Sequence, residues 1–214
     1  MDAVTGNLEV FLEGLRTTAI LTVVSFAAAL TLGTLVAAAR VSPVAPLRLA
    51  GTVYVELVRN TPLVVLMFLL YFGLPKIDIR FEPIPTAILA LSLYTAAFVA
   101  EVVRAGINTV SRGQAEAARA LGLTFSQTLA SVVLPLAMRT VVPPLGSLFI
   151  ALIRNTAVAY TISVAELTAR ADRLGNDTAE SVAALLAAGV VYMALTIPSG
   201  VVVGVLERRL AVKR

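Results

Sequence analysis

The feature that most limits how this chain can fold is a run of 23 residues, Thr17 to Ala39, that contains no charged side chain. Arg16 and Arg40 flank the run directly. At about 1.5 Å per residue, a helix of this length spans the ~30 Å hydrocarbon core of a bilayer. The run therefore predicts a transmembrane helix.

A cleavable signal peptide is the alternative interpretation of this run, because residues 37–39 (AAA) resemble a cleavage site. Two observations disfavour it. The run is longer than the apolar region of a signal peptide. The segment before it is acidic, with Asp2, Glu9 and Glu13, whereas a signal peptide begins with basic residues.

Four further apolar stretches extend the membrane interpretation to the whole chain. Hydrophobic residues make up 58% of the sequence and charged residues only 14%, whereas about a quarter of a soluble domain is charged. We expect residues 49–58 to form an amphipathic helix, with Thr61 as the cap of the helix that follows and Pro62 as its first residue. The expected fold is an all-α polytopic membrane protein, a single domain over residues 1–214. Its five transmembrane helices are expected at about 17–39, 61–75, 85–107, 141–164 and 181–206.

The distribution of Lys and Arg predicts the orientation of these helices. With the N-terminus outside, eleven basic residues fall in the inner segments and five in the outer ones, as the positive-inside rule favours. Five spans then place the C-terminus inside. The basic excess of +4 also suits nucleic acid, but the basic residues lie at the edges of apolar runs and form no stripe. A lipid bilayer is therefore the expected partner, and nucleic acid is not.

Missing residue types exclude several kinds of chemistry. The sequence contains no Cys and no His, so it has no thiol nucleophile and no histidine metal ligand or proton relay. It also lacks a Gly-rich phosphate-binding motif. An intramembrane enzyme would depend on isolated charges and hydroxyls without a nearby general base. A structural or assembly factor remains a further alternative.

The segment at about 112–135, on the expected inner side, has a readable local structure. Residues 114–121 are Ala-rich and predict a helix, in which Glu116 and Arg119 stand three residues apart. Gly122 suits a left-handed C-cap, and Thr124 with Gln127 forms a capping-box pattern. The prediction is a helix, a tight turn and a second helix. A capped loop that only connects two spans would show the same signals.

The spacing within this segment resembles the EAA loop of ABC importer permeases, whose pattern is E-A-A-x3-G-x9-I-x-L-P. Residues 116–118 (EAA), Gly122 and residues 132–135 (VVLP) match it, except that Val132 replaces Ile. In that family the loop docks into the ATPase subunit and transmits its closure to the membrane helices. The resemblance implies a docking surface made of Gln114, Glu116, Ala117, Ala118, Arg119, Ala120, Gly122 and Leu123.

Three other stretches, residues 58–75, 98–107 and 152–167, resemble the polar amino acid branch of this family. Residues 108–123 and 207–214 are most similar to actinobacterial glutamate permease subunits. The resemblance implies a non-catalytic subunit in the bacterial plasma membrane that binds no cofactor or metal itself. Its implied partners are two copies of an ATPase subunit carrying ATP and Mg, an amino-acid-binding protein outside the membrane, and a second permease subunit, in a heterodimer rather than a homodimer. The substrate would be glutamate, with glutamine, aspartate or a basic amino acid as alternatives.

A charged residue inside the fourth apolar stretch indicates where the substrate passes. Arg154 lies past the middle of that stretch, where an unpaired guanidinium costs several kcal/mol. Residues 152–157 (LIRNTA) also echo residues 57–62 (LVRNTP), and paired interruptions often mark a transporter's substrate site.

We therefore expect Arg154, Asn155 and Thr156 to line the path, with Arg154 binding a substrate carboxylate. Glu166 would receive the ammonium group, and Met67 and Tyr71 would wall the cavity. The alternative is that Arg154 pairs with Glu166 or with a carbonyl group and only holds helices together.

A second pair of charges lies near the inner end of the third stretch. Glu101 and Arg104 are three residues apart, so they can pair on one helix surface. We expect this pair to stabilise the helix end rather than to bind substrate.

Overall fold

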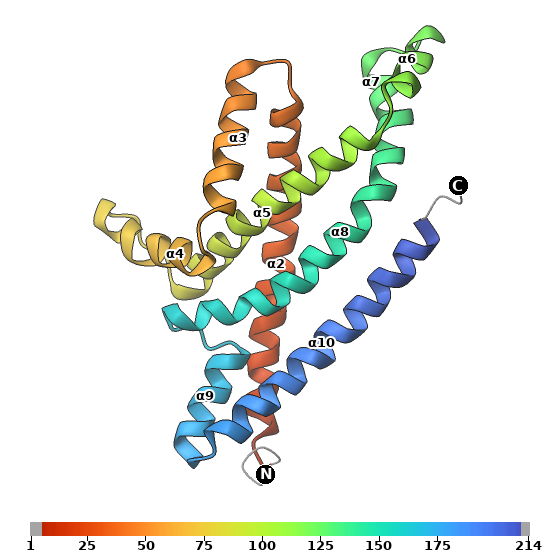
Figure 1. Cartoon of the computed structure of the whole chain (residues 1–214). Coiled ribbons are helices and arrows are strands. Elements are labelled where there is room, and N and C mark those ends of the chain that lie inside the picture. The colour runs from red at the N-terminus through yellow and green to blue at the C-terminus, as the bar shows by residue number, and fades with distance from the viewer. Residues whose placement is uncertain (1–5, 211–214) are drawn as a thin grey trace.

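The computed structural model describes residues 6–210, apart from the side chains of Arg112, Phe125, Ser126, Leu129, Ala130, Leu134 and Leu210. All secondary structure in this part of the chain is helical (Figure 1). The elements are α2 (Leu8–Val41), α3 (Ala45–Arg59), α4 (Leu63–Phe68), the π-helical η1 (Leu69–Gly73), the 3₁₀ segment η2 (Leu74–Ile77), α5 (Pro83–Thr109), α6 (Arg112–Ala120), α7 (Phe125–Thr128), the π-helical η3 (Leu129–Val133), α8 (Leu134–Asn155), the 3₁₀ segment η4 (Thr156–Ile162), α9 (Leu167–Thr178) and α10 (Ser181–Leu210).

Four helical segments of the described chain are long and apolar enough to cross a membrane, and a bent pair makes a possible fifth. The four are Leu8–Val41, Pro83–Thr109, Pro135–Ile162 and Ser181–Arg209. The fifth consists of Ala45–Arg59 and Leu63–Ile77, which meet at 107°. The all-helical polytopic membrane fold expected from the sequence is confirmed, with four candidate spans and a bent helix pair where the second span was expected.

The break follows from Pro62. Its backbone is extended, with φ −58° and ψ 138°. Proline also disfavours helix in the residue before it and has no N–H to donate, so α3 does not continue through this position. The expected cap at Thr61 is wrong, since the Thr61 hydroxyl donates to the Leu57 carbonyl oxygen at 2.8 Å. Pro62 itself precedes α4, which begins at Leu63. The chain therefore changes direction sharply inside an apolar region.

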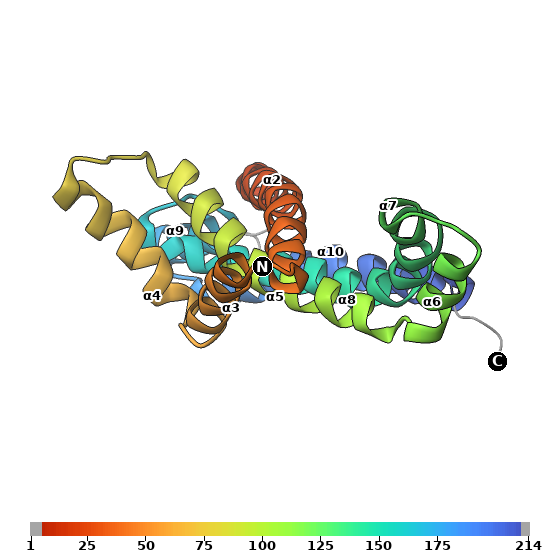
Figure 2. The ribbon, with the colours of Figure 1, turned by 90° about the horizontal axis from the view of Figure 1, so that it is seen from above.

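Helix α2 packs closely against α5. A Cβ at Gly33 would lie 2.6 Å from the Val99 side chain and 2.7 Å from the Ala96 carbonyl oxygen. Only glycine allows the two helices to approach this closely, as is common where transmembrane helices cross. Helix α3 returns alongside α2 as a hairpin and shares a small buried core with it and with α5 (Figures 1 and 2).

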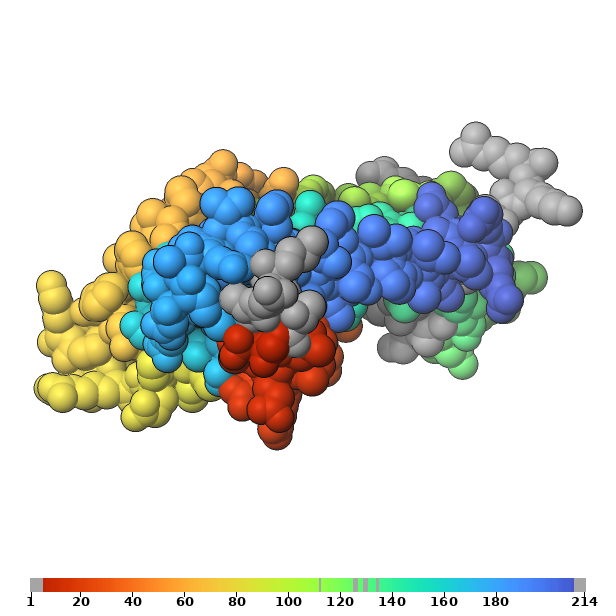
Figure 3. Space-filling view, turned by 90° about the horizontal axis from the view of Figure 1, so that it is seen from below, coloured from red at the N-terminus to blue at the C-terminus, as the bar shows by residue number. Residues whose placement is uncertain are grey.

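The helices divide the molecule into two ends. Helices α6 and α7, the α2–α3 connection and the last turns of α10 lie toward one end, and α9 lies with the first turns of α2 and α10 toward the other (Figure 1). Helix α10 runs across one face of the molecule (Figure 3), and its residues Val182, Leu186 and Ile197 are exposed. A large exposed apolar face of this kind is suited to contact with lipid or with another membrane subunit.

Candidate functional site

The turn after α6 is a well-formed helix C-terminus. The N–H of Gly122 donates to the Arg119 carbonyl oxygen at 2.9 Å, and the N–H of Leu123 donates to that of Ala118 at 3.2 Å. Gly122 has φ +87°. These bonds form a Schellman motif, which needs a left-handed residue at Gly122 and satisfies carbonyl groups that the helix end would otherwise leave free. The left-handed C-cap predicted at Gly122 is confirmed.

The helix that follows begins with the predicted capping box. Gln127 Oε1 accepts from the Thr124 N–H at 2.9 Å, and the Gln127 N–H donates to Thr124 Oγ1 at 3.3 Å. Helix α7 continues through η3 into α8, which carries Asn155 at its far end. The turn is therefore joined to the centre of the protein by one continuous helical path.

Most of the expected docking residues lie on the surface. Gln114, Glu116, Ala117, Arg119, Ala120 and Gly122 are exposed, Leu123 is half-buried, and Ala118 is buried beneath the turn. Glu116 and Arg119 form no ion pair in the described part of the chain. Both charged groups are therefore free to meet a partner.

Leu121 is an exposed residue of this turn that the sequence analysis missed. Its side chain is 83% exposed, the highest value among the large hydrophobic residues described. It is the C-cap residue of α6, between Ala120 and the left-handed Gly122. A large hydrophobic residue directly before the glycine that ends a short, exposed helix was the signal that could have identified it. We define the coupling surface as the exposed residues of α6 together with Leu121 and Gly122.

A pocket of about 190 Å³ lies between α5 and α8. Two of its lining residues mark its ends. Asn155 is the last residue of α8, at the end nearer α9, and Phe98 lies on α5, nearer the coupling surface. The pocket is mainly apolar with a few polar groups, as small-molecule sites usually are. Its lining residues are Tyr94, Thr95, Phe98, Leu148, Ala151, Leu152 and Asn155.

The three expected path residues take different positions. Asn155 lines the pocket, and its neighbour Arg154 is exposed and is not among the lining residues. Thr156 is fully buried, and its hydroxyl donates to the Ile153 carbonyl oxygen at 2.7 Å. Within the described residues Arg154 forms no ion pair, with Glu166 or otherwise. Helix α8 ends at Asn155 and gives way to η4, so both copies of the repeated R-N-T sequence interrupt a helix.

Glu166 has a different place from the one expected. It is fully buried and caps α9 by accepting from the N–H groups of Thr168 at 2.9 Å and Ala169 at 2.8 Å. The Tyr192 hydroxyl also donates to it at 2.7 Å. A buried carboxylate needs such donors, and here they occupy both oxygens. We therefore revise its expected role from binding the substrate ammonium to capping α9.

Met67 and Tyr71 also lie apart from the pocket lining. Met67 is fully buried in a core with Leu63, Leu91 and Leu152, and Tyr71 packs against the same core. The expectation that they wall the substrate cavity is not met in this structure, because α4 packs the face that carries Leu63 and Met67 against the protein core.

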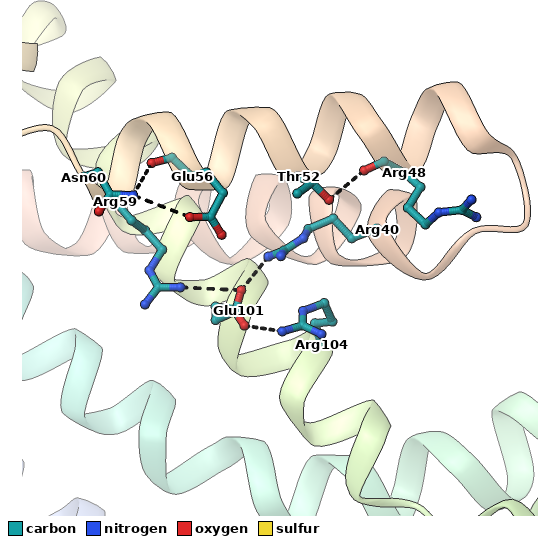
Figure 4. Close-up of polar contacts among 8 residues, drawn as sticks. All are labelled: Arg40, Arg48, Thr52, Glu56, Arg59, Asn60, Glu101 and Arg104. Carbon is teal, nitrogen blue, oxygen red and sulfur yellow. Dashed lines mark hydrogen bonds and ion pairs between the residues drawn. The ribbon is translucent and has the colours of Figure 1, made fainter.

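Glu101 lies at the centre of a group of three arginines (Figure 4). Its pairing with Arg104 on α5 is confirmed. Arg40 Nη1 from α2 lies 2.5 Å from Glu101 Oε2, and Arg59 Nη1 from α3 lies 3.6 Å from the same oxygen. The cluster therefore joins α2, α3 and α5, whereas the predicted pair of Glu101 and Arg104 lies on α5 alone.

The described chain contains no group of three or more His, Cys, Asp and Glu residues that could hold a metal.

Comparison with known proteins agrees with these features. The sequence profile described as "Binding-protein-dependent transport system inner membrane component" matches residues 29–212, most of the chain. The chain belongs to this family. It is therefore a multi-pass protein of the bacterial inner membrane and a non-catalytic permease subunit of an amino acid ABC importer. Such a subunit carries no cofactor and works with a binding protein and with an ATPase subunit that holds the ATP.

Individual relatives cover nearly the whole chain. The probable glutamine ABC transporter permease protein GlnM of Bacillus subtilis is 38% identical over 204 residues, which cover 95% of this chain and 94% of GlnM. The glutamate transport system permease protein GluC of Corynebacterium glutamicum is 41% identical, covering 91% of both chains. The crystal structure of an amino acid ABC transporter with histidines superposes with a TM-score of 0.91 at 30% identity, covering 96% of each chain.

Proposed function

We propose that this permease imports glutamate through the pocket between α5 and α8, in a heterodimer with a second permease subunit. The observation that carries the proposal is the exposed Arg154, which directly precedes the pocket-lining Asn155 and has no carboxylate partner in the described chain. An unpaired guanidinium within a membrane span favours an anionic ligand, and its fork matches a carboxylate. The similarity to GluC supports the same substrate.

The end of the molecule that carries the coupling surface is assigned to the cytoplasm, with the N-terminus outside. The excess of Lys and Arg in the segments at that end supports this orientation. The ATPase subunit would then bind the coupling surface, with Leu121 inserted as an apolar anchor and Glu116 and Arg119 at its edge. Burying an exposed leucine contributes about 1.5–3 kcal/mol to such a contact.

The continuity of the helices supports transport by alternating access. ATP-driven closure of the ATPase subunits moves α6 and α7, and the movement reaches Asn155 through η3 and α8. The bend between α3 and α4 supplies a second point at which the bundle can hinge. The chain transmits movement and shapes the path, while hydrolysis takes place on the partner.

Glutamine is the second candidate substrate. Asn155, Thr95 and Tyr94 line the pocket without a fixed charge, so they can hydrogen-bond an amide as well as a carboxylate. The similarity to GlnM supports this alternative.

Uptake by the reconstituted complex tests the proposal. The permease would be co-expressed with its ATPase and second permease subunits, placed in vesicles and supplied with the binding protein. We expect ATP-dependent uptake of L-glutamate to exceed that of L-glutamine and L-lysine, and the mass of the complex to include two different permease chains. Preferred uptake of L-lysine would contradict the substrate, and a homodimer would contradict the assembly.

A further inference from the structure

The Glu101 cluster contains more positive charge than its one carboxylate neutralises. Arg40, Arg59 and Arg104 all lie against Glu101 (Figure 4). In the described part of the chain no other acidic side chain forms an ion pair with any of the three. Two positive charges therefore remain available to a further anion.

Arg59 is the arginine of this cluster that can most easily change partner. Arg40 is 7% exposed and lies 2.5 Å from Glu101, and Arg104 is closely paired with it on the same helix. Arg59 is 37% exposed, and its Nη1 lies 3.6 Å from the carboxylate. A long, partly exposed ion pair contributes little to stability, so Arg59 can exchange Glu101 for another carboxylate at small cost.

The position of Arg59 connects the cluster to the pocket. Its guanidinium carbon lies 5.5 Å from the centre of the Phe98 ring, and Phe98 lines the pocket. Glu101 follows Phe98 by about one helical turn, in the direction of the coupling surface. Arg59 is also the last residue of α3, directly before the 107° bend. An amino acid that leaves Asn155 toward the coupling surface would therefore reach Arg59.

We propose that Arg59 receives a carboxylate of the amino acid as it leaves the pocket toward the coupling surface, and so sets the rate of release. The inference rests on the proposed function, since it requires an amino acid to pass between α5 and α8. Arg59 exchanges Glu101 for the substrate while Arg40 and Arg104 keep the Glu101 charge neutralised. The planar fork of arginine suits this task, because it binds a carboxylate through two parallel hydrogen bonds while lying on an aromatic ring.

The test uses the complete transporter in vesicles, with R59Q, R59K and the control R48Q. Arg48 lies on the same helix, but its Nη1 donates to the Ser42 carbonyl oxygen. For R59Q we expect the maximal rate of L-glutamate uptake to fall about tenfold without a rise in apparent KM, because release follows binding. ATP hydrolysis should fall much less, so less glutamate is moved per ATP. R59K should lie between R59Q and the wild type, and R48Q should match the wild type.

A purely structural Arg59 would give a different result, namely a parallel loss of uptake and ATP hydrolysis. Such a parallel loss, or uptake by R59Q at the wild-type rate, would overturn the proposal. If the R59Q complex does not assemble, the R59K complex provides the test. A lower amount of glutamate moved per ATP by R59K supports the proposal, and uptake by R59K at the wild-type rate overturns it. A wild-type complex that imports no amino acid would refute the proposed function and this inference together, whereas normal uptake by both wild type and R59Q would refute the inference alone.

Discussion

The backbone N–H of Leu123 donates to the Ala118 carbonyl oxygen at 3.2 Å, across a turn that holds Gly122 at φ +87°. This bond fixes the direction in which the chain leaves α6 and hence the shape of the coupling surface. A residue with a side chain adopts this conformation only with strain.

Gly122→Val is therefore expected to weaken binding of the ATPase subunit. A non-glycine residue in the left-handed region costs about 1–2 kcal/mol, which corresponds to roughly tenfold in affinity. Co-purification of the ATPase subunit and substrate-stimulated ATP hydrolysis measure the effect. Gly204→Val in α10 is the matched control, since it lies outside the coupling surface and a Cβ there meets no atom within 4 Å. Normal coupling in Gly122→Val would show that the turn does not determine docking.

Leu121→Asp tests the apolar anchor of the coupling surface. The side chain is 83% exposed, so its replacement should leave the thermal stability of the isolated permease unchanged. Docking should be lost, because a charge replaces apolar area that the interface would bury. Leu47→Asn on α3, also an exposed position, serves as the control. Retained binding of the ATPase subunit by Leu121→Asp would place the anchor elsewhere.

Glu101→Gln is expected to lower the amount of folded permease in the membrane. Removing one partner of a buried ion pair costs about 3–5 kcal/mol, and less is expected here because the Glu101 side chain is 26% exposed. Three arginines would then lack their shared carboxylate. Glu56→Gln is the control, because Glu56 is exposed and contacts Asn60. Wild-type membrane levels and melting temperature in Glu101→Gln would argue against a stabilising role.

Gly33→Ala probes the crossing of α2 and α5. Its Cβ would lie 2.6 Å from Val99 and 2.7 Å from a backbone oxygen, so the helices must separate at a cost of about 1–3 kcal/mol. The melting temperature of the detergent-purified complex should fall. Gly189→Ala in α10 should leave it unchanged, because a Cβ there meets no atom within 4 Å. Equal melting temperatures for the two variants would mean that the crossing is loosely packed.

Features set by neighbouring residues could be predicted from the sequence. The left-handed Gly122 and the capping box of Thr124 and Gln127 depend on contacts within a few residues, and the local pattern determines them. The apolar helices were likewise evident from charge-free runs. The pairing of Glu101 with Arg104 followed from their spacing on one helix.

Features set by packing between distant segments could not be predicted in this way. Arg40 and Glu101 are 61 positions apart, and Glu166 meets the Tyr192 hydroxyl 26 positions further along the chain. The burial of Met67 depends on the bend at Pro62, whose angle no local pattern specifies. Charge and hydropathy identified these residues as unusual, but only the fold shows which neighbour each one meets.

The most direct test of the central claim is ATP-driven L-glutamate uptake by the reconstituted complex carrying Arg154→Gln, compared with Arg173→Gln, an exposed arginine on α9. If the substrate carboxylate meets Arg154 beside Asn155, uptake should fall at least tenfold in Arg154→Gln, while subunit assembly is retained and Arg173→Gln behaves as the wild type. An assembled Arg154→Gln complex that takes up glutamate at the wild-type rate and apparent affinity would contradict the account.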